Sequence, residues 1–325
     1  MSARLIALAL ALLALVTLPF WLTGDYYINV ASQILFYAVF ALGLNIIAGY
    51  GGLVSLGHAG LLGIAAYTTG YLLQAGFDHT VAILTALVVG VAAMAVYAVL
   101  SLRATGIGFI MITLALGEII WGLCYRWISI TGGDNGINLH GRPHPFGYAI
   151  DSPSGFYYTT LVVFLACFAA VTMFARSPLG AALMGTRDQP RRMNALGYHV
   201  WAIRFWACML SGLLTAIAGV LFVYYTQFIS PQAVDLTSSA EVLLMVISGG
   251  AGTLLGPIVG AALVVIVKSV VSGFIERWNM LLGAIFVAIV ILMPEGLVPG
   301  TVRLWQLARR KLRAPDKPTV AESKP

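Results

Sequence analysis

Long runs of apolar residues, separated by short polar loops, dominate the pattern of this chain. Ten such runs predict membrane-spanning helices at 5–23, 28–48, 59–76, 80–102, 107–126, 156–175, 203–226, 238–252, 255–274 and 278–293. A helix of about 20 apolar residues crosses a hydrocarbon core of about 30 Å, because it rises about 1.5 Å per residue. The run 238–252 is short for a full span. The pattern therefore predicts an all-α integral membrane protein, a polytopic bundle of about eight to ten transmembrane helices.

The composition agrees with this prediction. Apolar residues make up 60% of the 325 residues and charged residues only 9%, whereas soluble domains have about 45–50% and about 25%. So little polar surface argues against a soluble enzyme, a nucleic-acid-binding domain and a disulfide scaffold. The three cysteines, Cys124, Cys167 and Cys208, lie apart in apolar surroundings. We expect them to be buried side chains and expect no metal site.

The charged residues predict how the bundle is oriented. Arginines concentrate in the loop 176–203 and basic residues in the tail 301–325, whereas the loop 128–155 has no basic excess. The positive-inside rule places the first two in the cytoplasm and the third outside. Ten spans then put both termini in the cytoplasm. Residues 1–300 form one transmembrane domain, and the polar, proline-containing tail is expected to be disordered.

Two glycine-rich stretches, 48–60 and 248–257, lie inside the apolar runs. Glycine and proline weaken a helix by about 1 and 3 kcal/mol relative to alanine, so both stretches predict interrupted helices. Interrupted helices near the middle of a membrane are typical of a transporter's substrate path. Small residues also allow helices to pack closely, and the two interpretations are compatible. Whether 45–67 or 248–260 lines a path stays open.

Four ionisable residues, His58, Glu118, Glu241 and Lys268, lie in or beside the predicted spans. Such groups are costly in hydrocarbon and usually face a bundle interior or a cavity. Lys268 either extends toward the surface or pairs with Glu241. Glu118 either pairs inside the bundle or lines a substrate path, and His58 either binds exposed backbone or contributes to that path.

The loop 176–203 contains a predicted helix of its own. Pro190 suits the first turn of a helix and Gly197 its end, which predicts about one and a half to two turns with a partly basic surface. It is either an ordinary cytoplasmic loop or the docking element for a soluble motor. The sequence has no G-x-x-x-x-G-K-[ST] motif. We therefore expect this chain not to be an enzyme, and any ATP chemistry to belong to another chain.

Several stretches, taken in order, resemble the permease subunits of bacterial ABC importers for branched-chain amino acids, of the LivM type. They are Gly43–Asn45 with Gly51–Tyr67 (GGLVSLGHAGLLGIAAY), Ile112–Ala115 with Glu118, Thr131–Ile137 (TGGDNGI), Arg187–Gly197 and Gly249–Gly260. The resemblance runs from about residue 30 to 300. Ser-Leu-Gly-His-Ala together with Thr-Gly-Gly-x-x-Gly is specific to this branch. The stretch 187–190 reads Arg-Asp-Gln-Pro, where the family often has Arg-Glu-Asn-Glu.

The resemblance implies a permease of the bacterial inner membrane that pairs with a second, homologous permease. Two ABC ATPase subunits would use ATP and Mg on its cytoplasmic face, and a periplasmic or lipid-anchored binding protein would deliver substrate. This chain would itself bind no cofactor. Membrane lipid is a further expected partner and nucleic acid is not. Related permeases serve urea, short amides or other amino acids, so these substrates stay open. An ion-coupled secondary transporter is the remaining alternative.

The resemblance and the sequence together give two groups of candidate site residues. The substrate path is predicted to include Asn45, Ser55, His58, Tyr67, Thr113, Glu118, Glu241, Gly249 and Gly250. The ATPase-coupling loop is predicted to use Arg187, Asp188, Arg191, Arg192, Asn194 and Gly197.

Overall fold

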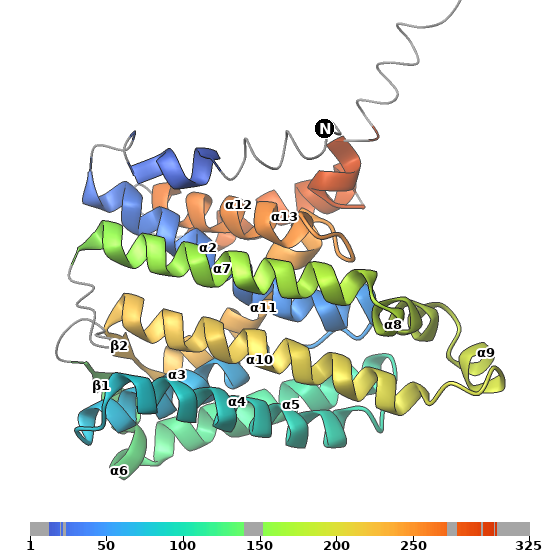
Figure 1. Ribbon diagram of the computed structural model, residues 1–325, viewed down its shortest axis with the longest axis horizontal. Helices are drawn as coiled ribbons and strands as arrows, with labels where there is room; N and C mark the ends of the chain where they lie inside the picture. The colour runs from blue at the N-terminus through green and yellow to red at the C-terminus, as the bar shows by residue number, and fades with distance from the viewer. Residues whose placement is uncertain are drawn as a thin grey trace, which may run out of the picture.

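Long helices lie side by side and share one main direction (Figure 1). The computed structural model describes residues 13–19, 21, 24–139, 152–271, 278–293, 295–301 and 303. Five helices in this part are long and apolar enough to cross a membrane. They are α2 with its π-helical end η1 (Asp25–Asn45 and Ile46–Tyr50), α4 (His79–Ser101), α5 (Ile107–Arg126), α7 (Pro153–Arg176) and α10 (Val200–Thr226).

Four shorter helices occupy the remaining predicted runs. They are α3 (His58–Gln74), α11 (Leu236–Gly249), α12 (Gly256–Val271) and α13 (Trp278–Leu292). Three of them begin or end at the glycine-rich stretches, where the predicted interruptions occur. Nine of the ten predicted runs thus form helices, which confirms the all-α bundle. Most of the first run, 5–23, and of the tail, 301–325, lies outside the described residues.

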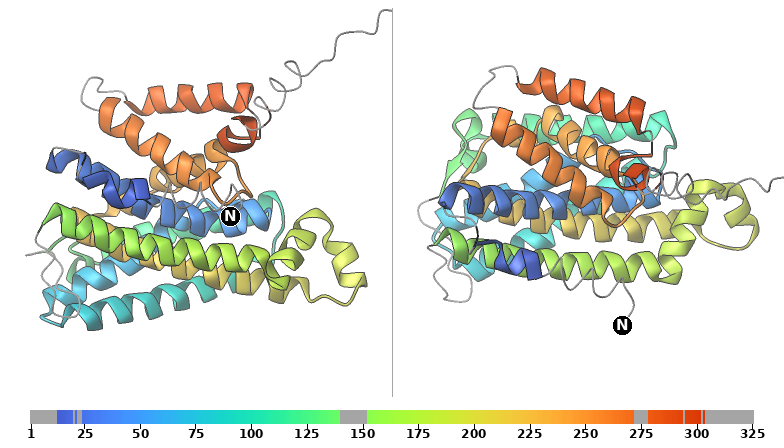
Figure 2. Two further views of the ribbon diagram at one scale, coloured as in Figure 1. Left: turned by 45° about the horizontal axis from the view of Figure 1, so that its top comes forward. Right: turned by 90° about the horizontal axis from the view of Figure 1, so that it is seen from above.

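The helices α2 and α10 form the centre of the bundle. In α2 72% of the most apolar window is buried and in α10 67%, against 28% in α4, 22% in α5 and 28% in α7. The helix α2 packs against α7, α10, α11 and α12. The helices α12 and α13 lie at one margin and α4 at the other (Figures 1 and 2). Because only 22% of its most apolar window is buried, α5 leaves most of its surface uncovered within this chain.

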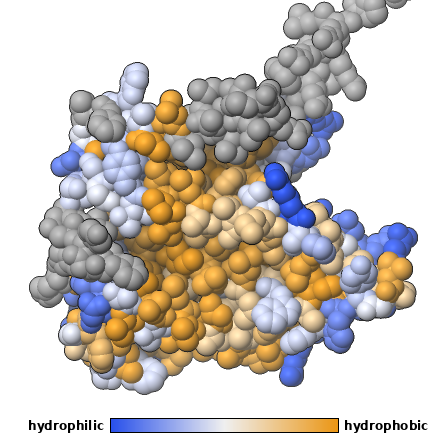
Figure 3. Space-filling view, viewed as in Figure 1, coloured by the Kyte–Doolittle hydropathy of each residue, from blue (hydrophilic) through white to orange (hydrophobic). Residues whose placement is uncertain are grey.

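The two ends of the bundle carry opposite charge. The short elements α6 (Ile128–Thr131), β1 (Ile137–Asn138) and β2 (Phe228–Ile229) lie at the end opposite α8 and α9 (Figure 1). The connections at the first end carry Asp25, Asp78, Asp134 and Asp235, and those at the second carry Arg103, Arg176, Arg187, Arg191 and Arg192. We call them the acidic end and the basic end. Between them the surface is mainly apolar on the face in Figure 3.

The Thr-Gly-Gly-x-x-Gly sequence builds a compact turn at the acidic end. The Thr131 hydroxyl donates to the Cys124 carbonyl (2.7 Å), and the Gly133 N–H donates to the same hydroxyl (3.2 Å). Gly132 and Gly136 adopt φ of +70° and +66°, a region that favours glycine. The turn leads into β1, which pairs antiparallel with β2. This motif therefore shapes the backbone at the acidic end.

The segment between α7 and α10 contains two helices where the sequence predicted one. Helix α9 (Pro190–Ala195) confirms the predicted short helix, and Gly197 follows it at φ +86°. Helix α8 (Pro178–Asp188), however, occupies residues that were expected to be loop. Ser177 caps it by accepting a hydrogen bond from the Gly180 N–H (3.2 Å). Ser-Pro at the start of a helix is a recognisable signal, so the sequence did contain a sign of α8.

Candidate functional site

The two glycine-rich stretches meet at the basic end, although about 200 residues separate them. The Asn45 side chain joins them: its Nδ2 donates to the Thr253 carbonyl (3.0 Å), and its Oδ1 accepts from the Gly252 N–H (2.8 Å). A β-carbon on Gly49 would fall within contact distance of the Gly252 backbone. The interruptions of α2 and of the α11–α12 pair therefore form one closely packed contact of backbone against backbone.

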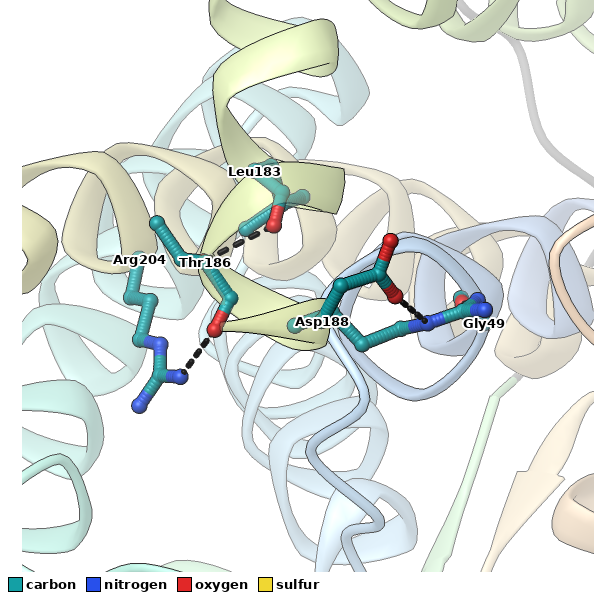
Figure 4. A network of polar contacts seen from close by, with 6 residues as sticks. Gly49, Leu183, Thr186, Asp188 and Arg204 are labelled. Carbon is teal, nitrogen blue, oxygen red and sulfur yellow. Dashed lines mark hydrogen bonds and ion pairs between the residues drawn. The ribbon is translucent and has the colours of Figure 1, made fainter. Parts of the chain in front are cut away.

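Arg187 connects this contact to α8. Its Nη1 donates to the Gly49 carbonyl (2.7 Å), and its Nε donates to Asp188 (3.3 Å) (Figure 4). A β-carbon on Gly52 would lie 3.2 Å from the Arg187 Cδ. The aliphatic part of the Arg187 side chain thus crosses the loop after η1, and its guanidinium group binds a carbonyl that the interrupted helix leaves free. Arg187 therefore links α8 to the point where the two glycine-rich stretches meet.

The other predicted coupling residues lie on the outside of this region. Asp188, Arg191, Arg192, Asn194 and Gly197 are all exposed, on α8, on α9 or just after it. They give this segment a mainly basic surface. We call α8, α9 and the turn at Gly197 the coupling surface. Arg187 is half-exposed, and it alone among the six predicted residues donates a side-chain hydrogen bond to a membrane-spanning segment in the described part.

His58 lies at the centre of a buried polar network. Its Nδ1 lies 2.8 Å from the Ser55 Oγ, and its Nε2 lies 3.2 Å from the Ser211 Oγ. Ser211 donates its hydroxyl to the Gly43 carbonyl (2.6 Å). Because that hydroxyl hydrogen is already used, Nε2 must carry the imidazole hydrogen toward Ser211, and Nδ1 accepts from Ser55 in the neutral ring.

The same network extends to α4 and α5. The Ser55 Oγ lies 3.1 Å from the Tyr97 Oη, and the Tyr97 hydroxyl donates to the Thr113 carbonyl (3.0 Å). The Thr113 hydroxyl in turn accepts from the Leu56 N–H (3.3 Å). His58, Ser55 and Thr113 have no exposed surface. These three predicted path residues thus lie together, and they satisfy the polar groups of the first interruption inside the bundle.

Glu118 lies elsewhere, on the uncovered face of α5. It is exposed and borders a hollow of about 300 Å³ at the acidic end. The hollow is also lined by Trp121, Tyr125, Asp134 and Asp235. Trp121 and Tyr125 stack with ring centroids 5.5 Å apart. The hollow therefore combines carboxylates with aromatic faces, both of which attract a cationic group.

The sequence prediction missed the other residues of this hollow. Glu118, Trp121 and Tyr125 are spaced i, i+3 and i+7, so they share one face of a helix. That spacing was available in the sequence. Asp134 and Asp235 come from separate loops, and only the fold brings them beside α5. In the described part of the chain, no group of three or more His, Cys, Asp or Glu side chains could hold a metal ion.

The remaining predicted path residues lie apart from the hollow. Gly249 and Gly250 belong to the tight contact between α11, α12 and the segment after α13: a β-carbon on Gly250 would meet the Pro299 ring. Tyr67 is buried among Cys124, Ile137 and Val234, and its hydroxyl has no hydrogen-bond partner among the described residues. Gly249, Gly250 and Tyr67 are therefore closely packed within the bundle.

Glu241 pairs with Lys268 between α11 and α12. Both carboxylate oxygens lie 3.1 Å from the Lys268 Nζ. The Glu241 side chain is 12% exposed and that of Lys268 33%. Lys268 was expected either to extend toward the surface or to pair with Glu241, and the structure shows the pair. Bidentate pairing satisfies both charges at a depth where an isolated charge would be costly.

Lys268→Met is therefore expected to lower the free energy of unfolding by about 2 kcal/mol, because it leaves the mostly buried Glu241 carboxylate without this partner. The double variant with Glu241→Gln is expected to recover most of that loss. Thermal unfolding of the purified chain in detergent measures both. Glu295→Gln, which breaks the exposed pair with Arg303, is the matched control and should change stability by less than about 0.5 kcal/mol. Equal losses in the single and double variants would contradict this prediction.

Comparison with known proteins by sequence finds one family and several relatives. Residues 26–290 match the family described as "Branched-chain amino acid transport system / permease component". The high-affinity branched-chain amino acid transport system permease protein LivM of Salmonella typhimurium (strain LT2) is 29% identical over 322 residues, covering 92% of this chain and 75% of its own length. LivM of Escherichia coli (strain K12) is 29% identical over 324 residues, with the same coverage of both chains.

Two further proteins are similar to this chain. The autoinducer 2 import system permease protein LsrC of Yersinia enterocolitica is 30% identical over 282 residues, covering 81% of this chain and 74% of its own length. A solved structure described as an inward-facing metal-chelate type ABC transporter superposes with a TM-score of 0.51 at 16% identity, covering 89% of this chain and 98% of the other. At that identity the likeness concerns the fold alone.

Proposed function

Because this chain belongs to the family of permease components of branched-chain amino acid transport systems, we propose that it forms part of the path by which an ABC importer moves aliphatic amino acids. The family makes it a membrane-spanning transport subunit of an ABC importer. The LivM relatives carry branched-chain amino acid transport in their names, which supports that substrate class. The LsrC relative has a different cargo in its name, so the family is broad.

The observation that carries this proposal is the position of Glu118. A carboxylate exposed on an apolar, membrane-length helix is costly against lipid, so this face of α5 must border water or another protein. The hollow beside it offers carboxylates and two aromatic rings to an ammonium group. Pro231 and Leu236 line the same hollow and offer apolar contact to an aliphatic side chain. This chemistry suits a zwitterion with an aliphatic side chain.

The same hollow suits a second substrate class. Urea and short amides are neutral hydrogen-bond donors, and the carboxylate oxygens of Glu118, Asp134 and Asp235 can accept from them. They lack an aliphatic side chain for Leu236 and a cationic group for the aromatic rings. We therefore favour branched-chain amino acids and keep urea and short amides as competing substrates in the test.

The resemblance to these importers implies the partners, and the uncovered surfaces offer places for them. A second, homologous permease would cover the face of α5 that bears Glu118, so that the path lies between two subunits. Two ABC ATPase subunits would dock on the coupling surface and use ATP and Mg there. A periplasmic or lipid-anchored binding protein would deliver substrate at the acidic end. With the chain in the bacterial inner membrane, the basic end and both termini would then face the cytoplasm.

The mechanism we propose uses the contact between α8 and the interrupted helices. ATP-driven movement of the coupling surface would displace Arg187 and the Gly49 carbonyl that it holds. That displacement would loosen the Asn45 bonds to Gly252 and Thr253, where the two glycine-rich stretches meet. A loosened contact at the basic end is one state of an alternating-access cycle, and the closed contact is the other.

Glu118→Lys is expected to reduce substrate uptake more than tenfold, because a positive charge in the hollow repels the substrate ammonium group. Glu118→Gln removes the attraction only and should have a smaller effect. Uptake of labelled leucine by proteoliposomes that hold the complete transporter and internal ATP measures both. Asp25→Lys makes the same change of charge at the same end, outside the hollow, and should leave uptake near its normal value.

The proteoliposomes also separate the alternatives. If urea at equal concentration lowers the uptake of labelled leucine, the amide class is favoured over amino acids. If the chain alone takes up leucine when driven by an ion gradient, without ATPase subunits, it is a secondary transporter and the ABC assignment fails. Normal leucine uptake by Glu118→Lys would remove the hollow from the substrate path.

A further inference from the structure

A second hollow, of about 480 Å³, lies at the basic end, beside the last residues of α4 and the start of α10. Its lining includes Leu102 just after α4, Asn194 of α9, and His199, Trp201 and Arg204 at the start of α10. Among the described residues that line it, none carries a carboxylate. Its polar groups can instead donate hydrogen bonds to an anion.

Arg204 is incompletely satisfied in this hollow. Its Nη2 donates to the Thr186 carbonyl (2.8 Å), as Figure 4 shows, whereas its Nε is buried and has no partner among the described residues. A buried guanidinium donor without an acceptor is costly, so the described residues leave part of the hydrogen-bonding capacity of Arg204 unused. Arg204 also lines the hollow, so the positive charge of its guanidinium group attracts an anion there.

The start of α10 adds to the attraction. His199 precedes the helix, and no side chain caps it. The N–H groups of the first turn of a helix have no acceptor within the helix, and the helix dipole places partial positive charge there. A 27-residue helix directs this end into a hollow that Arg204 also lines. Helix N-termini of this kind bind phosphate.

The surroundings of the hollow identify the source of the anion. Tyr198 is 50% exposed, Trp201 42% and Trp206 61%, and Trp201 stacks on Phe205 with ring centroids 5.1 Å apart. Exposed tryptophan and tyrosine at the end of a membrane-length helix are typical of the headgroup level of a bilayer. The flanking side chains therefore suit acyl chains and glycerol better than the polar surface of a soluble subunit.

From these observations we propose that the hollow binds the phosphate of an anionic phospholipid headgroup, in the leaflet that the basic end faces. Arg204 and the first turn of α10 bind the phosphate, Asn194 and His199 donate to the headgroup, and Trp201 contacts the glycerol and acyl region. Because Arg204 also holds the Thr186 carbonyl of α8, a bound lipid fixes α8 against α10. This goes beyond the transport function, and it makes the position of the coupling surface depend on the lipid.

The test measures phosphatidylglycerol binding to the complete purified transporter by native mass spectrometry, with phosphatidylcholine as the neutral lipid. His199→Asp is the main variant, because aspartate is a good helix cap and should not harm folding, yet its charge repels a phosphate. Arg204→Gln is the second variant. Each is expected to weaken phosphatidylglycerol binding by about tenfold to a hundredfold, the effect of losing one charge-assisted contact. Arg176→Gln, an exposed arginine at the same end, is the control and should bind normally.

Further measurements distinguish a phospholipid from the other sources of an anion. Inorganic phosphate that protects the transporter against heat as well as phosphatidylglycerol does would mean that the hollow binds free phosphate, which overturns the lipid assignment. Unchanged phosphatidylglycerol binding in both variants would also overturn it. If the variants instead lose the ATPase subunits while lipid binding is unchanged, an acidic side chain of that partner occupies the hollow, and the proposal is wrong.

Discussion

Gly249→Ala is expected to remove most of the folded protein from the membrane. A β-carbon on Gly249 would fall within contact distance of the Gly256 carbonyl oxygen and 3.0 Å from the Gly260 nitrogen. Both atoms belong to the backbone of α12, so no side chain can rotate away. Overpacking costs about 1–3 kcal/mol where side chains can adjust, and we expect the upper end of that range or more here.

The measurement for Gly249→Ala is the amount of full-length protein in the membrane fraction, followed by thermal unfolding of what is recovered. Gly283→Ala on α13 is the matched control, because a β-carbon there meets nothing within 4 Å. Alanine is the better helix former, so this control should be neutral or stabilising by up to about 1 kcal/mol. Normal amounts and stability for Gly249→Ala would mean that α11 and α12 are not held in this contact.

Arg187→Ala is expected to separate ATP hydrolysis from uptake. The variant loses the bond from α8 to the Gly49 carbonyl (2.7 Å), and the rest of the coupling surface is unchanged. We expect leucine uptake to fall more than tenfold while the assembled transporter still hydrolyses ATP. Proteoliposomes in which uptake and phosphate release are measured together report this ratio directly.

Two variants make the result for Arg187→Ala specific. Arg187→Lys keeps the charge and one donor, so it should retain part of the uptake, although lysine lacks the planar group that also reaches Asp188. Arg103→Ala removes an exposed arginine of the basic end that lies outside the coupling surface, and it should leave the ratio of uptake to hydrolysis unchanged. Full uptake by Arg187→Ala would show that α8 does not act through Gly49. Loss of the ATPase subunits would instead assign Arg187 to docking.

The two variants test successive parts of one region. Gly249 belongs to the contact of α11 with α12, and Gly252 and Thr253 follow it in the loop that Asn45 binds. Arg187 reaches the other side of that loop through Gly49. The first variant asks whether the region can form without its glycine, and the second asks whether a motion of α8 reaches it.

How much the sequence predicts about the surroundings of a residue differs from one residue to the next. His58 was singled out because a histidine in an apolar run is unusual, and the structure buries it with Ser55 and Ser211 in a network inside the bundle. Glu118 was singled out for the same reason, and it lies on a hollow. From sequence the two were indistinguishable, because hydropathy reports that a polar group is within a span and does not report which way it faces.

The sequence by itself determined where nine helices run, where the glycine-rich stretches interrupt them, and which loops carry the arginines. These properties depend on neighbouring residues: lipid requires each span to satisfy its own backbone, and glycine weakens a helix locally. Only the tertiary structure decided that Asn45 binds Gly252, that Arg187 reaches Gly49, and that Asp134 and Asp235 join Glu118. Helices that are apolar on all sides carry little sign of which face meets which neighbour, so those long-range contacts follow from packing alone.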